Sequence, residues 1–234
     1  MSTERRPRCV VVGGGGHARV VIDAIVASGM AIPVAVLDAD RSRWGAEVLG
    51  VPIVGGDDQL AGLVRGGGVT HFIVGVGGTG DNDPRRRLFE RALGSGLLPL
   101  TVRHPAAVCA GSAHVGDGSL LCATAVVQAA AVVGLNAILN TGSIVEHDCV
   151  LGNHVHLATG ARLCSTVRVG EGAHIGAGAT VRQCLSIGEG ALIGAGAVVI
   201  DDVAPRQVVV GVPARPLQPA QLAETSSRAV GVKG

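Results

Sequence analysis

Three histidines and two carboxylates lie within fourteen residues, SIVEHDCVLGNHVH from Ser143 to His156, in a chain otherwise rich in Gly, Ala, Val and Leu. At the centre of this segment, His147 lies between Glu146 and Asp148. Histidine suits a general base near neutral pH because its ordinary pKa is about 6.5, and such a base contributes about 10²–10⁴-fold to a rate. An adjacent carboxylate fixes the tautomer and stabilises the imidazolium that forms. The pattern predicts acid–base chemistry with His147 as the base and Asp148, with Glu146 second, as its partner.

A six-residue repeat must position these side chains. Every sixth residue is Ile, Leu or Val over fifteen consecutive positions: Val115, Leu121, Val127, Val133, Leu139, Val145, Leu151, Leu157, Leu163, Val169, Ile175, Val181, Ile187, Ile193 and Val199. A helix cannot place every sixth residue on one face. Three six-residue sides instead form a triangular coil of eighteen residues, with the aliphatic side chains stacked inward and successive coils about 4.8 Å apart. We expect a parallel β-helix over residues 106–217, closed by Val208–Leu217, and a polar tail over 218–234.

The phase of the repeat predicts where the histidines lie. Val145 points inward, so His147 falls at an exposed corner. His156 and His174 are eighteen residues apart and therefore lie one above the other in neighbouring coils. His154 lies on the same stretch as His156, and each of these histidines has the alternative of a polar turn residue without chemistry.

Residues 1–105 alternate strands and helices, which predicts a small parallel α/β domain. Helices are expected from about His17 to Ser28, around 57–64 and near 84–93, and strands at the start of the chain, at 32–38 and at 71–77.

A glycine loop lies between the first strand and the first helix. Gly13, Gly15 and Ala18 satisfy G-x-G-x-x-A, and Asp38 ends the second strand, which taken alone indicates NAD. About 100 residues supply little more than half of a dinucleotide fold, and a glycine turn before a helix binds any phosphate that reaches its amides. We therefore expect nucleotide or pyrophosphate binding. His17 is expected to donate to a phosphate or to cap the helix, and Asp38 to accept from a ribose or base or to be a turn residue.

Composition excludes several classes of partner. Lys and Arg total 19 against 18 acidic residues, and the aromatic residues are one Trp and two Phe, so no basic, stacking surface for nucleic acid is expected. The apolar run near the start is broken by glycines, and neither a signal peptide nor a membrane span is expected. Six cysteines without a CxxC pair suit a reducing cytoplasm, and no resident metal is expected.

The segment NTGSIVEHDCVLGNHVH, Asn140 to His156, with the glycine loop and the hexapeptide repeat, resembles the bacterial nucleotide-sugar N-acetyltransferases. That group includes the UDP-4-amino-sugar acetyltransferases of bacillosamine synthesis and related sialic-acid O-acetyltransferases. The resemblance covers nearly the whole chain. It implies a left-handed β-helix, acetyl-CoA as co-substrate, a nucleotide-linked amino sugar as acceptor, and a homotrimer with its active site between subunits.

The resemblance also implies roles for particular residues. His147 would deprotonate the sugar amine, Asp148 would raise its basicity, and Asn140 would orient the site. The implied contacts to the sugar nucleotide are Gly15, Gly16, His17 and Asp38, and Ala39 stands where a further acidic residue is expected. The implied contacts to CoA are His156, near the thioester, and the backbone of Ser165, Ala177 and Ala195.

Other functions stay open on the sequence. Sugar O-acetylation, of the sialic-acid type, uses the same base with a hydroxyl in place of an amine. A γ-carbonic-anhydrase-like metalloenzyme would use His147, His156 and His174 as ligands between subunits, but would leave the first domain without a role. An NAD-linked or regulatory nucleotide-binding protein rests on the glycine motif alone.

The outer surface of the prism favours oligomerisation. Apolar residues lie beside the inward-pointing aliphatics, namely Val126, Val132, Ile144 and Val150, and some of them must face outward. Trimer packing would cover these side chains and bring His147 of one subunit to the later coils of another.

Overall fold

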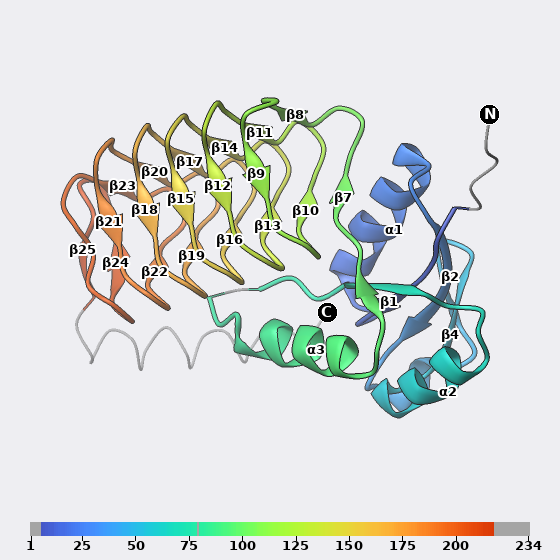
Figure 1. The fold of residues 1–234 in the computed structure, drawn as a ribbon. Helices are drawn as coiled ribbons and strands as arrows, with labels where there is room; N and C mark the ends of the chain where they lie inside the picture. Colours follow the sequence, from blue (N-terminus) through green and yellow to red (C-terminus); the bar gives the residue numbers. More distant parts are fainter. Residues whose placement is uncertain (1–5, 79, 218–234) are drawn as a thin grey trace.

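The computed structural model describes residues 6–78 and 80–217, in which an α/β domain is followed by a three-sided prism of short strands (Figure 1). The elements of the domain are β1 (Arg8–Val12), α1 (Gly16–Ser28), β2 (Ile32–Leu37), a 3-10 turn (Arg41–Arg43), β3 (Glu47–Val48), β4 (Val51–Gly55), a second 3-10 turn (Asp57–Gln59), α2 (Leu60–Arg65), β5 (His71–Val74), α3 (Asp83–Gly94) and β6 (Leu98–Pro99). The sheet has the order β3-β4-β2-β1-β5-β6 and is parallel except for the β3–β4 pair. The predicted alternation of strands and helices is confirmed.

The central strand β1 is apolar on both sides because both faces of the sheet are covered. Residues 9–12 are fully buried, as a parallel strand between two layers requires. On one face, Val21, Ile22 and Ile25 of α1 pack in the same cluster as the sheet and the first coils of the prism. On the other face, the rings of Phe72 and Phe89 lie 5.3 Å apart between centroids.

The prism has three faces, each a stack of strands of mostly two residues. The first face contains β7 (Val102–Arg103), β10 (Leu120–Leu121), β13 (Ile138–Leu139), β16 (His156–Leu157), β19 (His174–Ile175), β22 (Leu192–Ile193), β24 (Val208–Val210) and β25 (Arg215–Pro216). The second face contains β8 (Val108–Cys109), β11 (Val126–Val127), β14 (Ile144–Val145), β17 (Arg162–Leu163), β20 (Thr180–Val181) and β23 (Val198–Val199). The third face contains β9 (His114–Val115), β12 (Val132–Val133), β15 (Val150–Leu151), β18 (Arg168–Val169) and β21 (Ser186–Ile187).

The inward position of the repeat forms the core of the prism, as predicted. The second residue of each strand from Leu121 to Val199 is buried, and Val115 is partly buried against the same cluster. Fully burying one such aliphatic side chain contributes about 1.5–3 kcal/mol, so the stack stabilises the prism without a large aromatic core. The prism is the left-handed β-helix that the resemblance implies.

Three corners join the faces, and their backbone limits which residues fit. We call the turn after each first-face strand the first corner, the turn after each second-face strand the second corner, and the turn after each third-face strand the third corner. From the turn after β9 to the turn after β22, one residue of each turn has a positive φ, for example 59° at Asp148 and 70° at Gly142. A Cβ at Gly134 would lie 2.6 Å from the backbone of Gly152 one coil further, so glycine permits the close stacking of the third corner.

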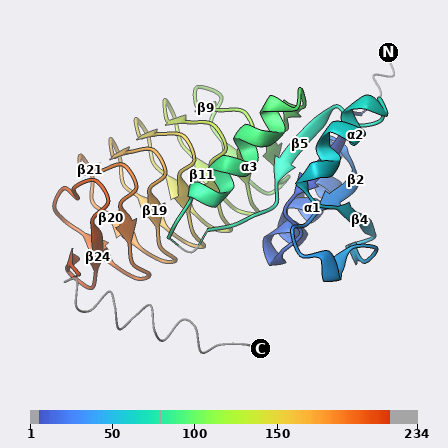
Figure 2. The ribbon, with the colours of Figure 1, turned by 90° about the horizontal axis from the view of Figure 1, so that it is seen from below.

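A glycine-rich segment fastens the α/β domain to the prism. The strap, which we define as residues 75–78 and 80–82, runs from β5 along the first face, and α3 then returns beside the prism (Figures 1 and 2). Gly78 lies against His156, and Gly80 lies against Leu192. The side chain of Asn82 donates to the carbonyls of Gly172 and Ala173, 3.0 and 3.3 Å away.

The structure refines several expectations. Strand β7 already pairs with β10, so the prism begins at Val102, inside the segment 1–105. His154, His156 and His174 are buried rather than exposed, because the strap and α3 cover this part of the prism. Strands β24 and β25 end the first face at 208–216, and the expected tail, 218–234, lies outside the described residues. Within 6–78 and 80–217, no helix has the length and apolar character needed to cross a membrane.

Candidate active site

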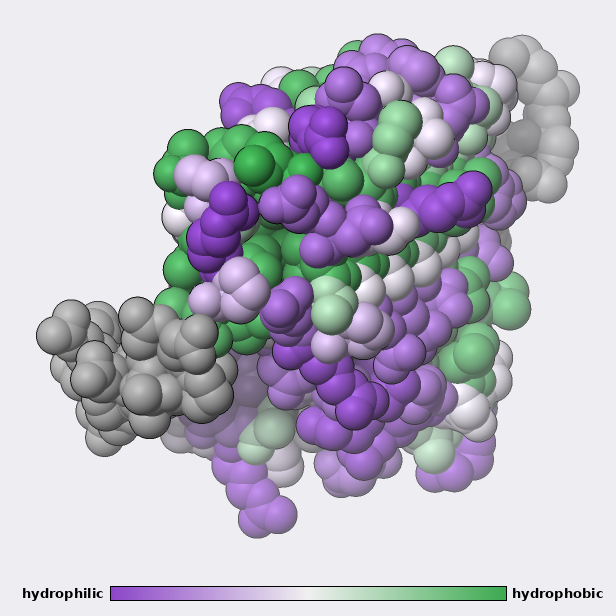
Figure 3. Space-filling view, turned by 90° about the vertical axis from the view of Figure 1, so that its left-hand side faces the viewer, coloured by the Kyte–Doolittle hydropathy of each residue, from purple (hydrophilic) through white to green (hydrophobic). Residues whose placement is uncertain are grey.

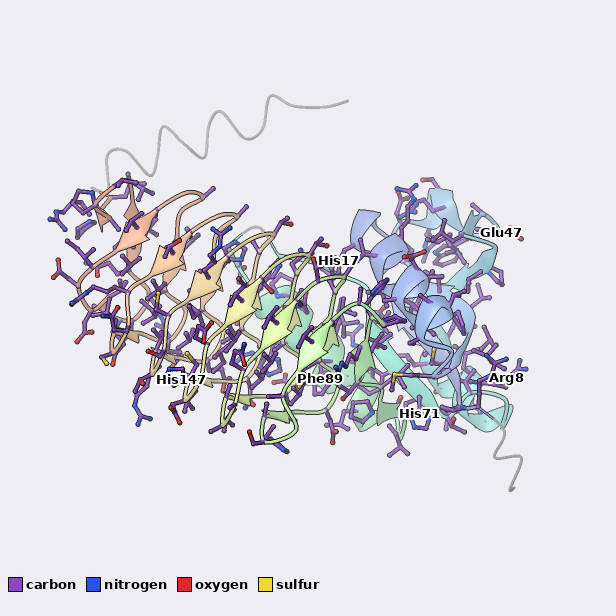
Figure 4. All side chains as sticks on the ribbon, turned by 90° about the horizontal axis from the view of Figure 1, so that it is seen from above. Arg8, His17, Glu47, His71, Phe89 and His147 are labelled. Atoms are coloured by element: carbon purple, nitrogen blue, oxygen red, sulfur yellow. The ribbon has the colours of Figure 1, made fainter. Side chains whose placement is uncertain are left out.

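The second corner of the prism carries His147 and its two carboxylate neighbours. Their order follows from the repeat, because β14 ends at Val145 and the chain turns before β15. Nδ1 of His147 lies 2.7 Å from Oδ2 of Asp148, and their side chains are 54% and 58% exposed. Glu146 instead accepts from the backbone N–H of His147 at 3.4 Å. The geometry agrees with Asp148 as the partner of the imidazole, and Figure 4 shows His147 at an edge of the prism away from the α/β domain.

Ser165 lies directly above His147 in the next coil. The backbone N–H of Thr166 donates to the carbonyl of His147 at 3.0 Å, and Cys184 in the following coil donates to Ser165 at 3.0 Å. The thiol of Cys149, inside the same corner, is buried, and burial is the main cause that raises its pKa. This corner is thus a regular column that carries the imidazole of His147 and, in the turn two coils further, Arg182.

Asn140 occupies the first corner, a full side of the prism away from His147. Its Oδ1 accepts from the N–H of Thr141 at 2.8 Å, which is a local turn contact. Ala177 and Ala195 belong to this same corner, and the N–H of Gly196 donates to the carbonyl of Ala177 at 2.8 Å. Within one chain, therefore, the structure places Asn140 at the same corner as Ala177 and Ala195, but not at the corner of His147.

The glycine loop and the end of β2 line a pocket of about 220 Å³. Its walls include Gly13, Gly14, Gly15, Asp38 and Arg43. Gly15 is the N-cap of α1 and offers no side chain, so amides at this helix start are open to an anion. A Cβ at Gly14 would lie 2.6 Å from Oδ2 of Asp38, so glycine is needed for the carboxylate to approach the loop.

Asp38 is held by a partner that the sequence analysis missed. Arg43, from the 3-10 turn after β2, donates to Oδ2 of Asp38 at 2.5 Å, and the N–H of Asp40 donates to Oδ1 at 2.9 Å. The ring N–H of Trp44 donates to the carbonyl of Asp38 at 2.8 Å. Asp40 itself accepts from Ser42, the main cause that lowers its pKa. The carboxylate of Asp40 thus stabilises the turn, and Arg43 is the basic side chain that lines the pocket, beside Asp38 and Asp57.

His17 turns away from this pocket toward the prism. It follows Gly16 at the start of α1, and its ring lies against Gly77 of the strap, where the two parts of the molecule meet (Figure 4). Burial, followed by the charge of Arg85, lowers the pKa of His17 to about 4. Its Nε2 has no hydrogen-bond partner among the described residues.

His156 and His174 lie on the first face beneath the strap. They are register partners in β16 and β19, and their ring centroids are 4.8 Å apart at an interplanar angle of 83°. Burial is the largest cause that lowers the pKa of His156 to about 3, followed by His174, Arg85 and His17. Burial also lowers the pKa of His174, with a further contribution from Arg85. Both imidazoles are uncharged at neutral pH.

Arg85 explains much of this electrostatic environment. It lies on α3, is 1% exposed, and donates to the backbone carbonyls of Asn136 and His154 at the third corner. Burial lowers its pKa to about 9, so it remains charged at neutral pH. His154 lies beside it, and burial together with Arg85 lowers the pKa of His154 to about 4. Arg85 lies four and seven residues before Phe89 and Ala92, on the same side of α3, and this helical spacing could have predicted from the sequence that Arg85 is buried.

The comparisons with known proteins agree with this geometry. The family model of the PglD N-terminal domain matches residues 8–92, and that of the bacterial transferase hexapeptide repeat matches residues 148–183 and 166–201. The acetyltransferase domain of PglB from Neisseria gonorrhoeae is 37% identical, with a TM-score of 0.83 over 90% of this chain and 99% of its own. The chain belongs to the hexapeptide-repeat acetyltransferases that carry a PglD N-terminal domain.

Two further solved structures extend the comparison. A variant of perosamine N-acetyltransferase from Caulobacter crescentus, in complex with CoA and GDP-perosamine, is 37% identical, with a TM-score of 0.84 over 93% of this chain and all of its own. WeeI from Acinetobacter baumannii is 26% identical, with a TM-score of 0.76 over 90% of this chain and 99% of its own. A search of curated proteins returned no match.

Three predictions are thereby confirmed: the family, the left-handed β-helix behind an α/β domain, and the class of enzyme, an acetyltransferase. The PglB domain has also been solved in complex with acetyl-CoA, and the perosamine N-acetyltransferase in complex with CoA and GDP-perosamine, which agrees with the expected co-substrate and acceptor. The three histidines considered as metal ligands do not meet within one chain, because His147 lies at the second corner while His156 and His174 lie on the first face. In the part of the chain that the structure describes, no group of three or more His, Cys, Asp or Glu side chains is arranged to hold a metal ion.

Proposed function

We propose that this chain transfers the acetyl group of acetyl-CoA to the amino group of a nucleotide-linked amino sugar, and that it works as a cytoplasmic homotrimer. The observation that carries the proposal is the His147–Asp148 pair, 2.7 Å apart on an exposed corner of the β-helix, in a chain that also has a glycine-loop pocket for a nucleotide. Six free cysteines agree with a reducing compartment.

His147 acts as the general base. Its Nδ1–H donates to Asp148, which leaves Nε2 to accept a proton from the attacking amine. The amine nitrogen attacks the thioester carbonyl carbon, the C–S bond breaks, and the electron pair leaves on the CoA sulfur. The proton taken by His147 is then available to the thiolate, so the products are the N-acetyl sugar and CoA thiol, with no covalent enzyme intermediate.

The glycine loop holds the nucleotide part of the acceptor. The amides of Gly15 and Gly16 at the start of α1 bind the pyrophosphate, because a helix N-terminus presents unpaired N–H groups and a positive dipole end. Asp38, together with Arg43, contacts the ribose or base. His17, at the second position of α1, turns from this pocket toward the prism, so we assign it to the sugar end of the acceptor and not to the nucleotide. The perosamine N-acetyltransferase, solved in complex with CoA and GDP-perosamine, supports a nucleotide-linked amino sugar as the class of acceptor.

Acetyl-CoA binds along the prism, with His156 near the thioester and the backbone of Ser165, Ala177 and Ala195 beside the remainder. These residues lie on one face and two different corners of a single chain, and the nucleotide pocket lies away from His147. In a trimer, His147 of one subunit would lie beside the CoA contacts and the nucleotide pocket of another subunit. Val132 and Val150, which are 40% and 36% exposed on the third face, supply apolar surface for such contacts. Figure 3 shows exposed apolar surface between hydrophilic bands at the far end of the prism.

The experiment is an assay of CoA thiol release from acetyl-CoA with a panel of UDP- and GDP-linked amino sugars. We expect release with at least one acceptor, a base-stable amide product by mass spectrometry, and loss of release in His147→Ala. Equal thiol release with and without every acceptor refutes the activity, and an ester product assigns O-acetylation instead. Sedimentation at micromolar concentration tests the trimer, and a monomer alone contradicts it.

A further inference from the structure

The outward-pointing column of side chains on the first face is aliphatic at first and then contains two histidines. From β7 to β22, its members are the first residues of successive strands: Val102, Leu120, Ile138, His156, His174 and Leu192. All except Leu192 are buried beneath the α/β domain and the strap. Aliphatic side chains suit a covered column because they need no hydrogen bonds, whereas an imidazole does. The two histidines therefore interrupt the column for a reason other than packing.

The polar atoms at this interruption lack partners. Neither ring nitrogen of His156, nor Nδ1 of His174, makes a hydrogen bond with any described residue. Nε2 of His17, beside the strap, and Oδ1 of Asn82, within the strap, also make no hydrogen bond with a described residue. Proteins concentrate such unsatisfied buried groups where a site must act on something else.

His174 is the aromatic neighbour of His156. The two rings meet edge to face, with centroids 4.8 Å apart and an angle of 83° between their planes. The backbone of Gly78 acts on the imidazole of His156 and partly opposes the fall of its pKa, but neither ring nitrogen forms a hydrogen bond of normal geometry with a described residue. The plane of the ring is therefore set by its contacts with His174 on one side and with Gly78 of the strap on another. Arg85 and His17 are the charged and titratable groups that act on His156 besides His174, and both favour its uncharged form. An uncharged imidazole carries one N–H, and the plane of the ring decides where that donor points.

We propose that His174 is a positioning residue that holds the ring of His156 in the plane in which its N–H faces the acetyl thioester. The inference rests on the proposed function, in which His156 lies next to that thioester. Negative charge gathers on the thioester oxygen as the amine attacks, and removal of one aligned donor to such an oxygen typically costs about 10²–10³-fold in kcat. His174 does not touch the substrate. Its removal therefore leaves the N–H donor of His156 in place but no longer holds that donor in line with the thioester oxygen.

The test is a double-mutant cycle between His174 and His156. His174→Leu fits the column, because Leu192 occupies the same position one coil further. We expect kcat to fall by about 10-fold or more, within the loss expected for the donor itself, while KM for the sugar nucleotide and the melting temperature are maintained. His174→Phe keeps the edge-to-face contact and recovers most of kcat. In the His156→Leu background, His174→Leu has no further effect, because it acts through His156.

The matched control is His71→Leu. His71 is the first residue of β5 in the α/β domain, outside the prism, so this variant is expected to retain wild-type kcat. The proposal is overturned if His174→Leu retains the wild-type kcat. It is also overturned if His174→Leu lowers kcat by the same factor in the wild type and in the His156→Leu background.

A second measurement separates this inference from the proposed function. If the wild type acetylates no amino sugar, the proposed function fails, but the orientation of His156 can still be read by NMR of ¹⁵N-histidine-labelled protein. We expect a single tautomer of His156 in the wild type and a mixture in His174→Leu. An unchanged tautomer in the variant contradicts the role of His174 whatever the activity.

Discussion

Nδ1 of His147 and Oδ2 of Asp148 lie 2.7 Å apart although they belong to adjacent residues, which is possible because Asp148 has a φ of 59° at the turn. Most residues adopt this left-handed conformation only at an energetic cost, whereas Asp and Asn tolerate it. The corner therefore positions the carboxylate through its own backbone, without help from a second element.

Removal of the imidazole is expected to abolish most of the activity and to leave the fold intact. His147→Ala removes the base, so kcat in the thiol-release assay should fall by about 10²–10⁴-fold. The side chain is 54% exposed, and the free energy of unfolding should change by no more than about 0.5 kcal/mol. The control is Gln183→Ala, at the same corner position two coils further, which should match the wild type. Equal activity of His147→Ala and this control would refute the role of His147.

The two carboxylates beside His147 are expected to differ. Asp148→Asn keeps a residue that accepts the left-handed turn but removes the negative charge that stabilises the imidazolium, so kcat should fall by at least about 10-fold. Glu146→Gln should have a smaller effect, because Glu146 accepts from the backbone and not from the imidazole. Steady-state kinetics of both variants decides the matter, and a larger loss in Glu146→Gln would reverse the assignment.

The glycine loop offers a selective test of the nucleotide pocket. In Gly14→Ala the new Cβ would lie 2.6 Å from Oδ2 of Asp38, so the carboxylate must move. We expect KM for the sugar nucleotide to rise by about 10-fold, equivalent to about 1.4 kcal/mol, while KM for acetyl-CoA stays constant. Gly62→Ala, where a Cβ meets nothing within 4 Å, is the control. A rise confined to the KM for acetyl-CoA would show that the pocket binds acetyl-CoA and not the sugar nucleotide.

The buried histidines are expected to make the fold sensitive to acid. The pKa values of His17 and His154 are lowered to about 4 and that of His156 to about 3, against about 6.5 in the unfolded chain. Between these values the unfolded state binds more protons, so the free energy of unfolding falls as the pH drops from about 6.5 toward 4. Denaturant unfolding at a series of pH values measures this fall.

A variant isolates one histidine from the carboxylates that also titrate in acid. His156→Leu should lose about 2 kcal/mol less than the wild type between pH 7.5 and pH 5, because each unit of lowered pKa corresponds to about 1.4 kcal/mol. Parallel pH profiles for the two proteins would show that His156 is not buried in its neutral form.

Arg85 is expected to anchor the α/β domain to the prism. Arg85→Ala leaves the carbonyls of Asn136 and His154 without a donor, and hydrogen bonds to a charged group are worth about 1.5–3 kcal/mol each, so we expect a loss of about 3 kcal/mol or more in the free energy of unfolding. Arg87→Ala on the exposed side of α3 should change it by no more than about 0.5 kcal/mol. Equal melting temperatures for the two variants would show that Arg85 does not anchor the α/β domain to the prism.

The sequence predicted those features that depend on local periodicity. Each aliphatic of the repeat packs against the equivalent residue of the next coil, so the inward column and the corner position of His147 follow from counting residues. The burial of His156 could not be predicted from the spacing of the repeat. It depends on the strap, which reaches the first face from a segment nearly eighty residues earlier. Arg43 was missed for a related reason, since its contact with Asp38 depends on the turn between them.

The coverage of the first face also bears on how copies of the chain can associate. An uncovered triangular rod has three equivalent flanks and could add neighbours in every direction. Here the chain's own α/β domain and strap cover much of the first face, so two faces remain for other copies. A closed ring requires two contact surfaces from each member, whereas a growing lattice of rods requires more. This coverage therefore removes one direction of growth as well as joining the two halves of the molecule.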